Sequence, residues 1–166
     1  MNTVIGQKSE FAIEYKLNKT EPHIMGNVCI WLEGKYLGYL FEEIILGVFQ
    51  NAFKQLTNRL NQLENSEFDD KSFVEIYKLI ASGKLDTGKH IFAPGESFDD
   101  FIIYVYKKDD ELNFIWKLCD EPFYNYPEYN NEINHKSIQT ERFLECIERF
   151  NKELNSSIEE KSSCSK

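Results

Sequence analysis

Residues 26–39 read Gly-Asn-Val-Cys-Ile-Trp-Leu-Glu-Gly-Lys-Tyr-Leu-Gly-Tyr, a pattern that is typical of a β-hairpin. From Val28 to Glu33 the side chains alternate between two faces, and β-branched and aromatic residues are frequent, which predicts a strand. Glu33-Gly34 supplies the turn, because glycine adopts a positive φ without strain. Residues 36–39 predict the returning strand, in which Gly38 marks a bulge or a point of tight packing.

The chain on either side of this hairpin predicts one more strand and a long helix. Residues 11–17 alternate apolar and polar side chains, so a strand with one wet face is expected, and a three-stranded antiparallel meander is the economical arrangement. Apolar residues then recur every three or four positions from Glu42 to Leu63, which predicts a helix. Glu42 and Glu43 would suit the positive end of its dipole, and Gly47 would permit close contact with the sheet.

A second helix is predicted over residues 71–81. Asp69 or Asp70 is expected to be its N-cap, because a carboxylate there accepts hydrogen bonds from unpaired amides of the first turn. Ser82-Gly83 is expected to end it.

The second half of the chain predicts another hairpin and a last helix. Residues 98–118 alternate about a charged turn at 107–111, and the first arm is apolar on both faces, so it is expected to be a central strand. Residues 119–135 have no period and are expected to be irregular. A helix over 138–154, capped by Ser137, completes the domain.

These elements predict an α+β fold, in which an antiparallel sheet, a three-stranded meander plus a second hairpin, packs against about three helices. The 166 residues are enough for one domain that buries roughly 70% of its unfolded surface. Residues 1–154 are expected to form this single domain. The segment 155–166, rich in Ser, Glu and Lys, is expected to be a disordered tail.

The composition is acidic, with 28 Asp plus Glu against 19 Lys plus Arg and a net charge of −9. This balance argues against nucleic-acid binding, which depends on neutralising phosphates, and fits a basic protein partner. No signal peptide is apparent and no apolar run approaches 18 residues, so no membrane span and a cytoplasmic location are expected. The cysteines are widely spaced and expected to be reduced: Cys29, Cys119, Cys146 and Cys164. No cofactor is indicated.

Three patterns resemble catalytic or ligand-binding motifs. Residues 83–89 have the spacing of a phosphate-binding loop, but a helix precedes them and the required following helix is not expected. The histidines are isolated in sequence and are expected at the surface or in loops: His23, His90 and His135. The acidic doublets could bind a metal or act as an acid/base pair, although caps, turns and strand starts explain them as well: Asp69-Asp70, Asp99-Asp100 and Asp109-Asp110. No catalytic or metal-ligating residue is therefore assigned.

One stretch has the character of a protein-binding surface. Residues 96–132 contain ten acidic residues and three lysines, and an aromatic cluster lies in the loop. Acidic charge steers a basic partner, and loop aromatics provide contact area. The same composition would result if the acidic side chains were simply exposed to solvent and the aromatic side chains packed against their own loop. The candidate partner-binding residues are Asp109, Asp110, Asp120, Glu121, Phe123, Tyr124, Tyr126 and Tyr129.

Three stretches in the first part of the chain carry a resemblance to a known family. They are residues 11–15, residues 28–32 with Gly34, and Leu37-Gly38, and they resemble the opening of the bacterial immunity protein 42 family. Residues 98–101 and 114–118 are similar to its second half, and the resemblance covers about 11–150. It implies a cytoplasmic protein, made beside a polymorphic or contact-dependent toxin, that binds and neutralises the toxin's C-terminal domain. No functional residues are carried over, because the matching motifs are apolar.

If the toxin is a nuclease, an acidic inhibitor could occupy its basic groove as a phosphate mimic. The alternative functions are a small metal-dependent hydrolase that uses the acidic doublets, for which Asp99 or Asp100 would be essential, and an adaptor that binds a small ligand in the sheet. The oligomeric state is left open.

Overall fold

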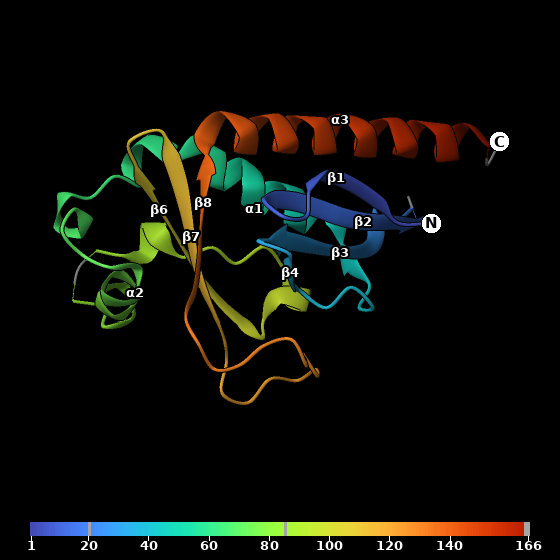
Figure 1. Ribbon diagram of the computed structural model, residues 1–166. Helices are drawn as coiled ribbons and strands as arrows, with labels where there is room; N and C mark the ends of the chain where they lie inside the picture. The colour runs from blue at the N-terminus through green and yellow to red at the C-terminus, as the bar shows by residue number, and fades with distance from the viewer. Residues whose placement is uncertain (20, 85, 165–166) are drawn as a thin grey trace.

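The computed structural model describes residues 1–19, 21–84 and 86–164, with side chains up to residue 160. An N-terminal antiparallel sheet has the strand order β1-β2-β3-β4 (Figure 1). A short strand, β5, pairs with the other end of β3. Its strands are β1 (Thr3–Gln7), β2 (Phe11–Lys19), β3 (Met25–Leu32), β4 (Lys35–Leu37) and β5 (Ile44–Ile45). The expected meander is β2-β3-β4, and β1 extends it at the edge, where only Ile5 is buried and the sequence signal is correspondingly weak.

The hairpin that organises the sequence forms as expected. Glu33 and Gly34 have φ values of +54° and +79°, so both central residues of this two-residue turn are left-handed, as a type I′ turn requires. Gly38 is also left-handed, with φ +93°, and a Cβ there would lie 2.7 Å from the ring of Phe98. Tight packing at this glycine is therefore confirmed.

Helix α1 (Leu46–Asn58) begins four residues later than expected and is followed by the 3₁₀ turn η1 (Leu60–Gln62). The chain of Ile44 and Ile45 is extended, because β5 pairs with β3, so Glu42 and Glu43 precede the helix and its first turn has no acidic residue. The expected role of Gly47 is also wrong, since a Cβ there would meet only the Ile45 Cγ2 atom, at 4.0 Å.

Helix α2 (Phe73–Ala81) follows the 3₁₀ turn η2 (Ser66–Phe68). Its cap is Ser72 rather than Asp69 or Asp70, because the Ser72 hydroxyl accepts from the Glu75 amide while the Glu75 carboxylate accepts from the Ser72 amide. The helix ends as expected, with Gly83 at φ +64°.

A second antiparallel sheet has the order β6-β7-β8. Its strands are β6 (Phe101–Lys108), β7 (Glu111–Leu118) and β8 (Asn134–Gln139). The central strand is β7 and not β6, because β8 pairs with β7 from Glu111 to Trp116 on the side away from β6. Strand β8 is polar in sequence, with only Ile138 buried, which is why the sequence indicates irregular chain up to residue 135. The expected cap Ser137 consequently lies in β8.

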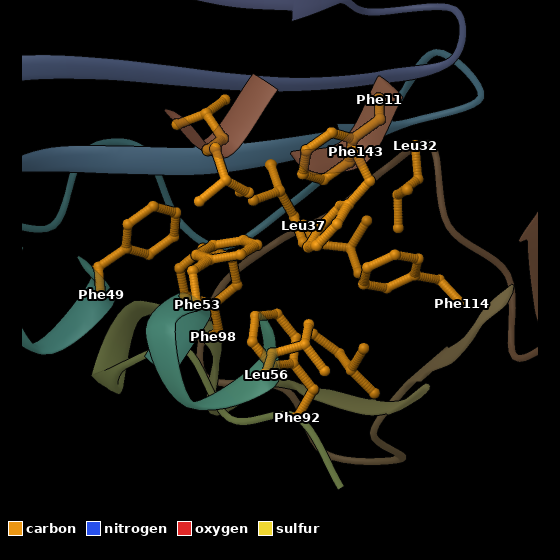
Figure 2. Close-up of a cluster of buried hydrophobic side chains, with 14 of the residues drawn as sticks. Phe11, Leu32, Leu37, Phe49, Phe53, Leu56, Phe92, Phe98, Phe114 and Phe143 are labelled. Carbon is orange, nitrogen blue, oxygen red and sulfur yellow. The ribbon is translucent and has the colours of Figure 1, made fainter. Parts of the chain in front are cut away.

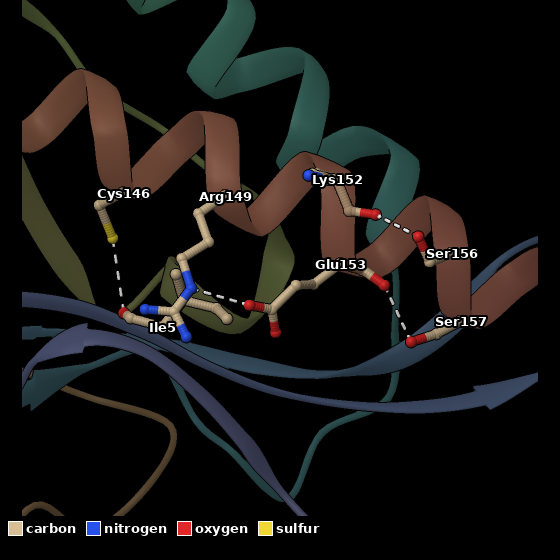
Figure 3. Close-up of polar contacts among 7 residues, drawn as sticks. All are labelled: Ile5, Cys146, Arg149, Lys152, Glu153, Ser156 and Ser157. Carbon is tan, nitrogen blue, oxygen red and sulfur yellow. Dashed lines mark hydrogen bonds and ion pairs between the residues drawn. The ribbon is translucent and has the colours of Figure 1, made fainter.

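Helix α3 (Thr140–Cys164) lies across both sheets (Figure 1). Figure 3 shows its docking on β1, where the Cys146 thiol donates to the Ile5 carbonyl oxygen at 3.4 Å, and the Arg149–Glu153 ion pair on the helix at 2.8 Å. The helix does not end at Leu154, as the sequence predicts, but continues to Cys164.

The main core lies between α1, α3 and the inner faces of the two sheets. Figure 2 shows its aromatic centre: Phe11, Phe49, Phe53, Phe92, Phe98, Phe114 and Phe143. A smaller core covers the opposite face of β6-β7, where Tyr104, Tyr106 and Ile115 pack against α2. The fold is thus α+β, as expected, with the second sheet buried on both faces.

Candidate interaction surface

The aromatic loop between β7 and β8, residues 119–133, is anchored by a buried carboxylate. Asp100 is 2% exposed, and its two oxygens accept hydrogen bonds from the amides of Phe123 at 2.7 Å and Tyr124 at 3.1 Å. The Tyr129 hydroxyl donates to the Tyr36 carbonyl oxygen at 3.0 Å. These bonds tie the loop to β4 and to the start of β6.

The four loop aromatics differ in exposure. Tyr126 is buried against Phe101, and burial together with the Asp100 carboxylate raises its pKa, so the phenol stays neutral. Tyr129 is half-buried, and Tyr124 stacks on Tyr39 with ring centroids 3.7 Å apart. Phe123 is 85% exposed.

A second exposed phenylalanine lies on the same side of the molecule. Phe41 is 82% exposed and its ring packs against Tyr39, the residue on which Tyr124 stacks. An open hollow of about 560 Å³ adjoins these rings and is lined by Glu42, Glu96, Asp99, Phe123 and Tyr124. We call Tyr39, Phe41, Glu42, Glu96, Asp99, Phe123 and Tyr124 the acidic aromatic surface.

The structure brings together some of the residues that the sequence indicates and separates others. Asp120 and Glu121 are exposed in the same loop as Phe123 and Tyr124, and Asp120 forms an ion pair with Lys117 at 3.0 Å. Tyr126 and Tyr129 belong to the interior of the loop.

Asp109 and Asp110 lie at the opposite end of the β6-β7 hairpin from the aromatic loop. The register pairs Lys108 with Glu111 at their end and Phe101 with Leu118 at the loop end, so seven residues of strand, about 23 Å, separate the two. The acidic charge of the stretch 96–132 is therefore divided between two ends of the sheet.

Five residues of the acidic aromatic surface are not among the sequence candidates: Tyr39, Phe41, Glu42, Glu96 and Asp99. The helical period assigned to residues 42–63 concealed Glu42, because a glutamate in a first helical turn needs no other explanation. Exposure of Phe41 depends on where the chain turns between β4 and β5, which no local pattern shows.

Two of the three histidines lie elsewhere than the sequence indicates. His23 is exposed, as expected, but His90 is fully buried and pairs through Nδ1 with the Val105 carbonyl oxygen at 2.9 Å. His135 lies in β8, half-buried, with Nε2 2.9 Å from Asn113 Oδ1 and its ring stacked on Phe73. Burial lowers the pKa of both His90 and His135, so both imidazole rings are uncharged at neutral pH. Their role in the fold is packing.

The other motifs have structural explanations in the described chain. Asp69-Asp70 precede α2, Asp109 lies in the β6-β7 turn with φ +53°, and Asp100 holds the aromatic loop. The segment 83–89 follows a helix, and its described residues end in a single 3₁₀ turn, η3 (Gly88–His90), rather than in the helix N-terminus that binds phosphate.

The described residues form neither a metal-type cluster nor a membrane-spanning helix. Among the residues that the structure describes, no group of three or more His, Cys, Asp or Glu side chains is placed to hold a metal ion. No helix in the same residues has both the length and the apolar character of a membrane span.

Comparison with known proteins places the chain in a family. Residues 1–153 match the family described as Immunity protein 42. The fold is similar to the crystal structure of CdiI from Burkholderia dolosa AUO158, with a TM-score of 0.64 and 17% sequence identity over 91% of this chain and 99% of that chain. The search of curated proteins gave no match. Because the family match spans nearly the whole chain, the chain belongs to the Immunity protein 42 family.

Proposed function

We propose that this protein is a non-enzymatic immunity protein that binds a bacterial toxin and neutralises it. The observation that carries the proposal is the family match over residues 1–153, and the likeness in fold to a CdiI agrees with it. The partner is the C-terminal domain of a contact-dependent or related polymorphic toxin, and the encounter takes place in the bacterial cytoplasm.

The acidic aromatic surface is the proposed toxin-binding site, extended by Asp120 and Glu121 along the loop. Phe41 and Phe123 are exposed at 82% and 85%, which is costly for an isolated protein but suits the anchors of an interface. The carboxylates of Glu42, Glu96 and Asp99 line the hollow beside Phe123 and attract a basic partner. The Asp100 hydrogen bonds hold Phe123 in place before binding, which reduces the entropy lost on association.

The charge of this surface suggests how inhibition would occur. A nuclease has a basic groove that binds the phosphate backbone of its nucleic-acid substrate. A rigid acidic surface can occupy that groove in place of the nucleic acid. We therefore propose a nuclease as the toxin, and a block of its substrate groove as the mode of neutralisation.

The test uses the toxin domain encoded beside this protein. Co-expression should protect cells, and Phe123→Ala should weaken the purified complex by about 2 kcal/mol or more, roughly thirtyfold in Kd, because a central aromatic anchor is lost. Leu144→Ala on α3, also a partly exposed apolar residue, is the matched control and should leave Kd unchanged. If Phe123→Ala leaves Kd unchanged and still protects cells, the toxin binds elsewhere. If the unmodified protein does not protect cells, the proposed function itself is refuted.

A further inference from the structure

A second hollow lies on the outer face of the N-terminal sheet, beside the acidic aromatic surface. Its volume is about 290 Å³, and its walls include Trp31, Tyr36, Tyr39 and Phe41. Pockets that enclose a drug-sized ligand measure roughly 300–1,000 Å³, so this one suits a single side chain. Tyr39 and Phe41 border both the hollow and the acidic aromatic surface, so a partner that covers Phe41 also covers the mouth of the hollow.

The hollow contains a nearly buried carboxylate. The Glu14 side chain is 10% exposed and accepts hydrogen bonds from Trp31 Nε1 and Asn2 Nδ2, each at 2.9 Å. Burial alone would raise the pKa of Glu14, but the hydrogen bonds from Lys8, Asn2 and Trp31 outweigh it and the pKa is lowered. The group is thus an anion at neutral pH, and a buried anion requires a cation beside it.

Lys8 supplies that cation within the same chain. Its Nζ atom lies 2.7 Å from Glu14 Oε2 and 4.0 Å from the centroid of the Trp31 ring. A carboxylate and an indole face together recognise a cationic side chain. Lys8 approaches from the turn between β1 and β2, and its side chain is 42% exposed, so the ammonium can leave for water without disturbing a strand.

We propose that the hollow receives one arginine side chain of the toxin, which displaces Lys8. Arginine suits the hollow better than lysine, because its planar guanidinium can donate to both oxygens of Glu14 while it stacks on Trp31. Lys8 keeps Glu14 paired until the partner arrives. The inference rests on the proposed function for the identity of the partner, but the chemistry of the hollow can be tested without any toxin.

The first experiment titrates the protein with N-acetyl-arginine methylamide and follows tryptophan fluorescence. A change is assigned to Trp31, because the second tryptophan, Trp116, is fully buried and out of reach of the added compound. We expect a saturable change, about tenfold tighter in Lys8→Ala because the internal competitor is gone. The Glu14→Gln variant should not respond. The neutral citrulline analogue should not cause saturation. A Lys8→Ala protein that shows no saturation, or that responds equally to citrulline, would overturn the proposal.

The second experiment measures the toxin complex. We expect Glu14→Gln and Trp31→Phe each to raise Kd about tenfold, while Lys8→Ala leaves it equal or lower. Thermal unfolding of each variant checks that it folds. If Glu14→Gln does not fold, the Trp31→Phe variant still tests the hollow. If both variants bind as tightly as the unmodified protein while Phe123→Ala weakens binding, the hollow plays no part although the immunity function stands. If the unmodified protein neither binds nor protects, the function fails first.

Discussion

At the scale of single residues, Asp100 links the fold to the proposed interface. Its carboxylate is buried and accepts two loop amides, and its own carbonyl oxygen accepts from the Cys119 amide. Asp100→Ala should lower the free energy of unfolding by about 3 kcal/mol, because two amides lose charge-assisted hydrogen bonds. Urea denaturation measures this loss. The exposed neighbour Asp99→Ala is the control and should stay within about 0.5 kcal/mol of the unmodified protein.

We expect His90 to make the stability of the fold depend on pH. Its pKa is lowered by burial, so it is neutral in the folded protein, and Nε2 has no hydrogen-bond partner in the described part of the chain. As the pH falls below about 6.5, His90 takes up a proton in the unfolded chain before it does so in the folded protein. The free energy of unfolding therefore falls between about pH 6.5 and the lower pKa of the folded state, by about 1.4 kcal/mol per unit of pKa shift.

The His90→Asn variant removes the titrating group while an amide can still reach Val105. We expect its stability to change less between pH 7 and pH 5 than that of the unmodified protein, as measured by thermal unfolding. His23→Asn, at an exposed position, should keep the original pH dependence. An unaltered pH profile in His90→Asn would exclude His90 as the source.

At the scale of elements, α3 decides where the domain ends. Leu154 is fully buried and Ile158 packs against the main core, whereas the residues beyond are rich in Ser, Glu and Lys. A chain ending at residue 158 should unfold at nearly the same temperature as the full chain. A chain ending at residue 153 should lose about 3 kcal/mol, because the buried Leu154 is absent. Calorimetry of the two truncated chains tests this, and an equal loss in both would place the end of the ordered helix further along.

At the scale of the whole molecule, net charge and its position should govern association with a basic toxin. The net charge is −9, so the association rate should fall at least tenfold between 0.05 and 0.5 M salt, as stopped-flow measurements can show. Neutralising Glu96 and Asp99 to Gln and Asn should slow association more than neutralising Asp109 and Asp110 to Asn. Both pairs remove two exposed charges, but only the first pair lies on the acidic aromatic surface. Equal slowing would indicate a general field instead of a localised site.

The sequence alone determined the features that depend on neighbouring residues. The turn at Glu33-Gly34 needs two left-handed residues, the strands on either side follow a two-residue period, and α1 buries a regular face, so local chemistry specifies each of them. The same logic fails for β8, which is polar because its burial comes from pairing with β7 and not from its own side chains.

Only the tertiary structure decided which charged and aromatic side chains share a surface. Asp109 and Phe123 are close in sequence but lie at opposite ends of a hairpin, whereas Tyr39 and Tyr124 are distant in sequence and stack at 3.7 Å. Glu14 and Lys8 acquire their roles because β3 brings Trp31 beside them. The physical reason is that local periods set the faces of each element, while the contacts between elements follow from how those faces are buried together.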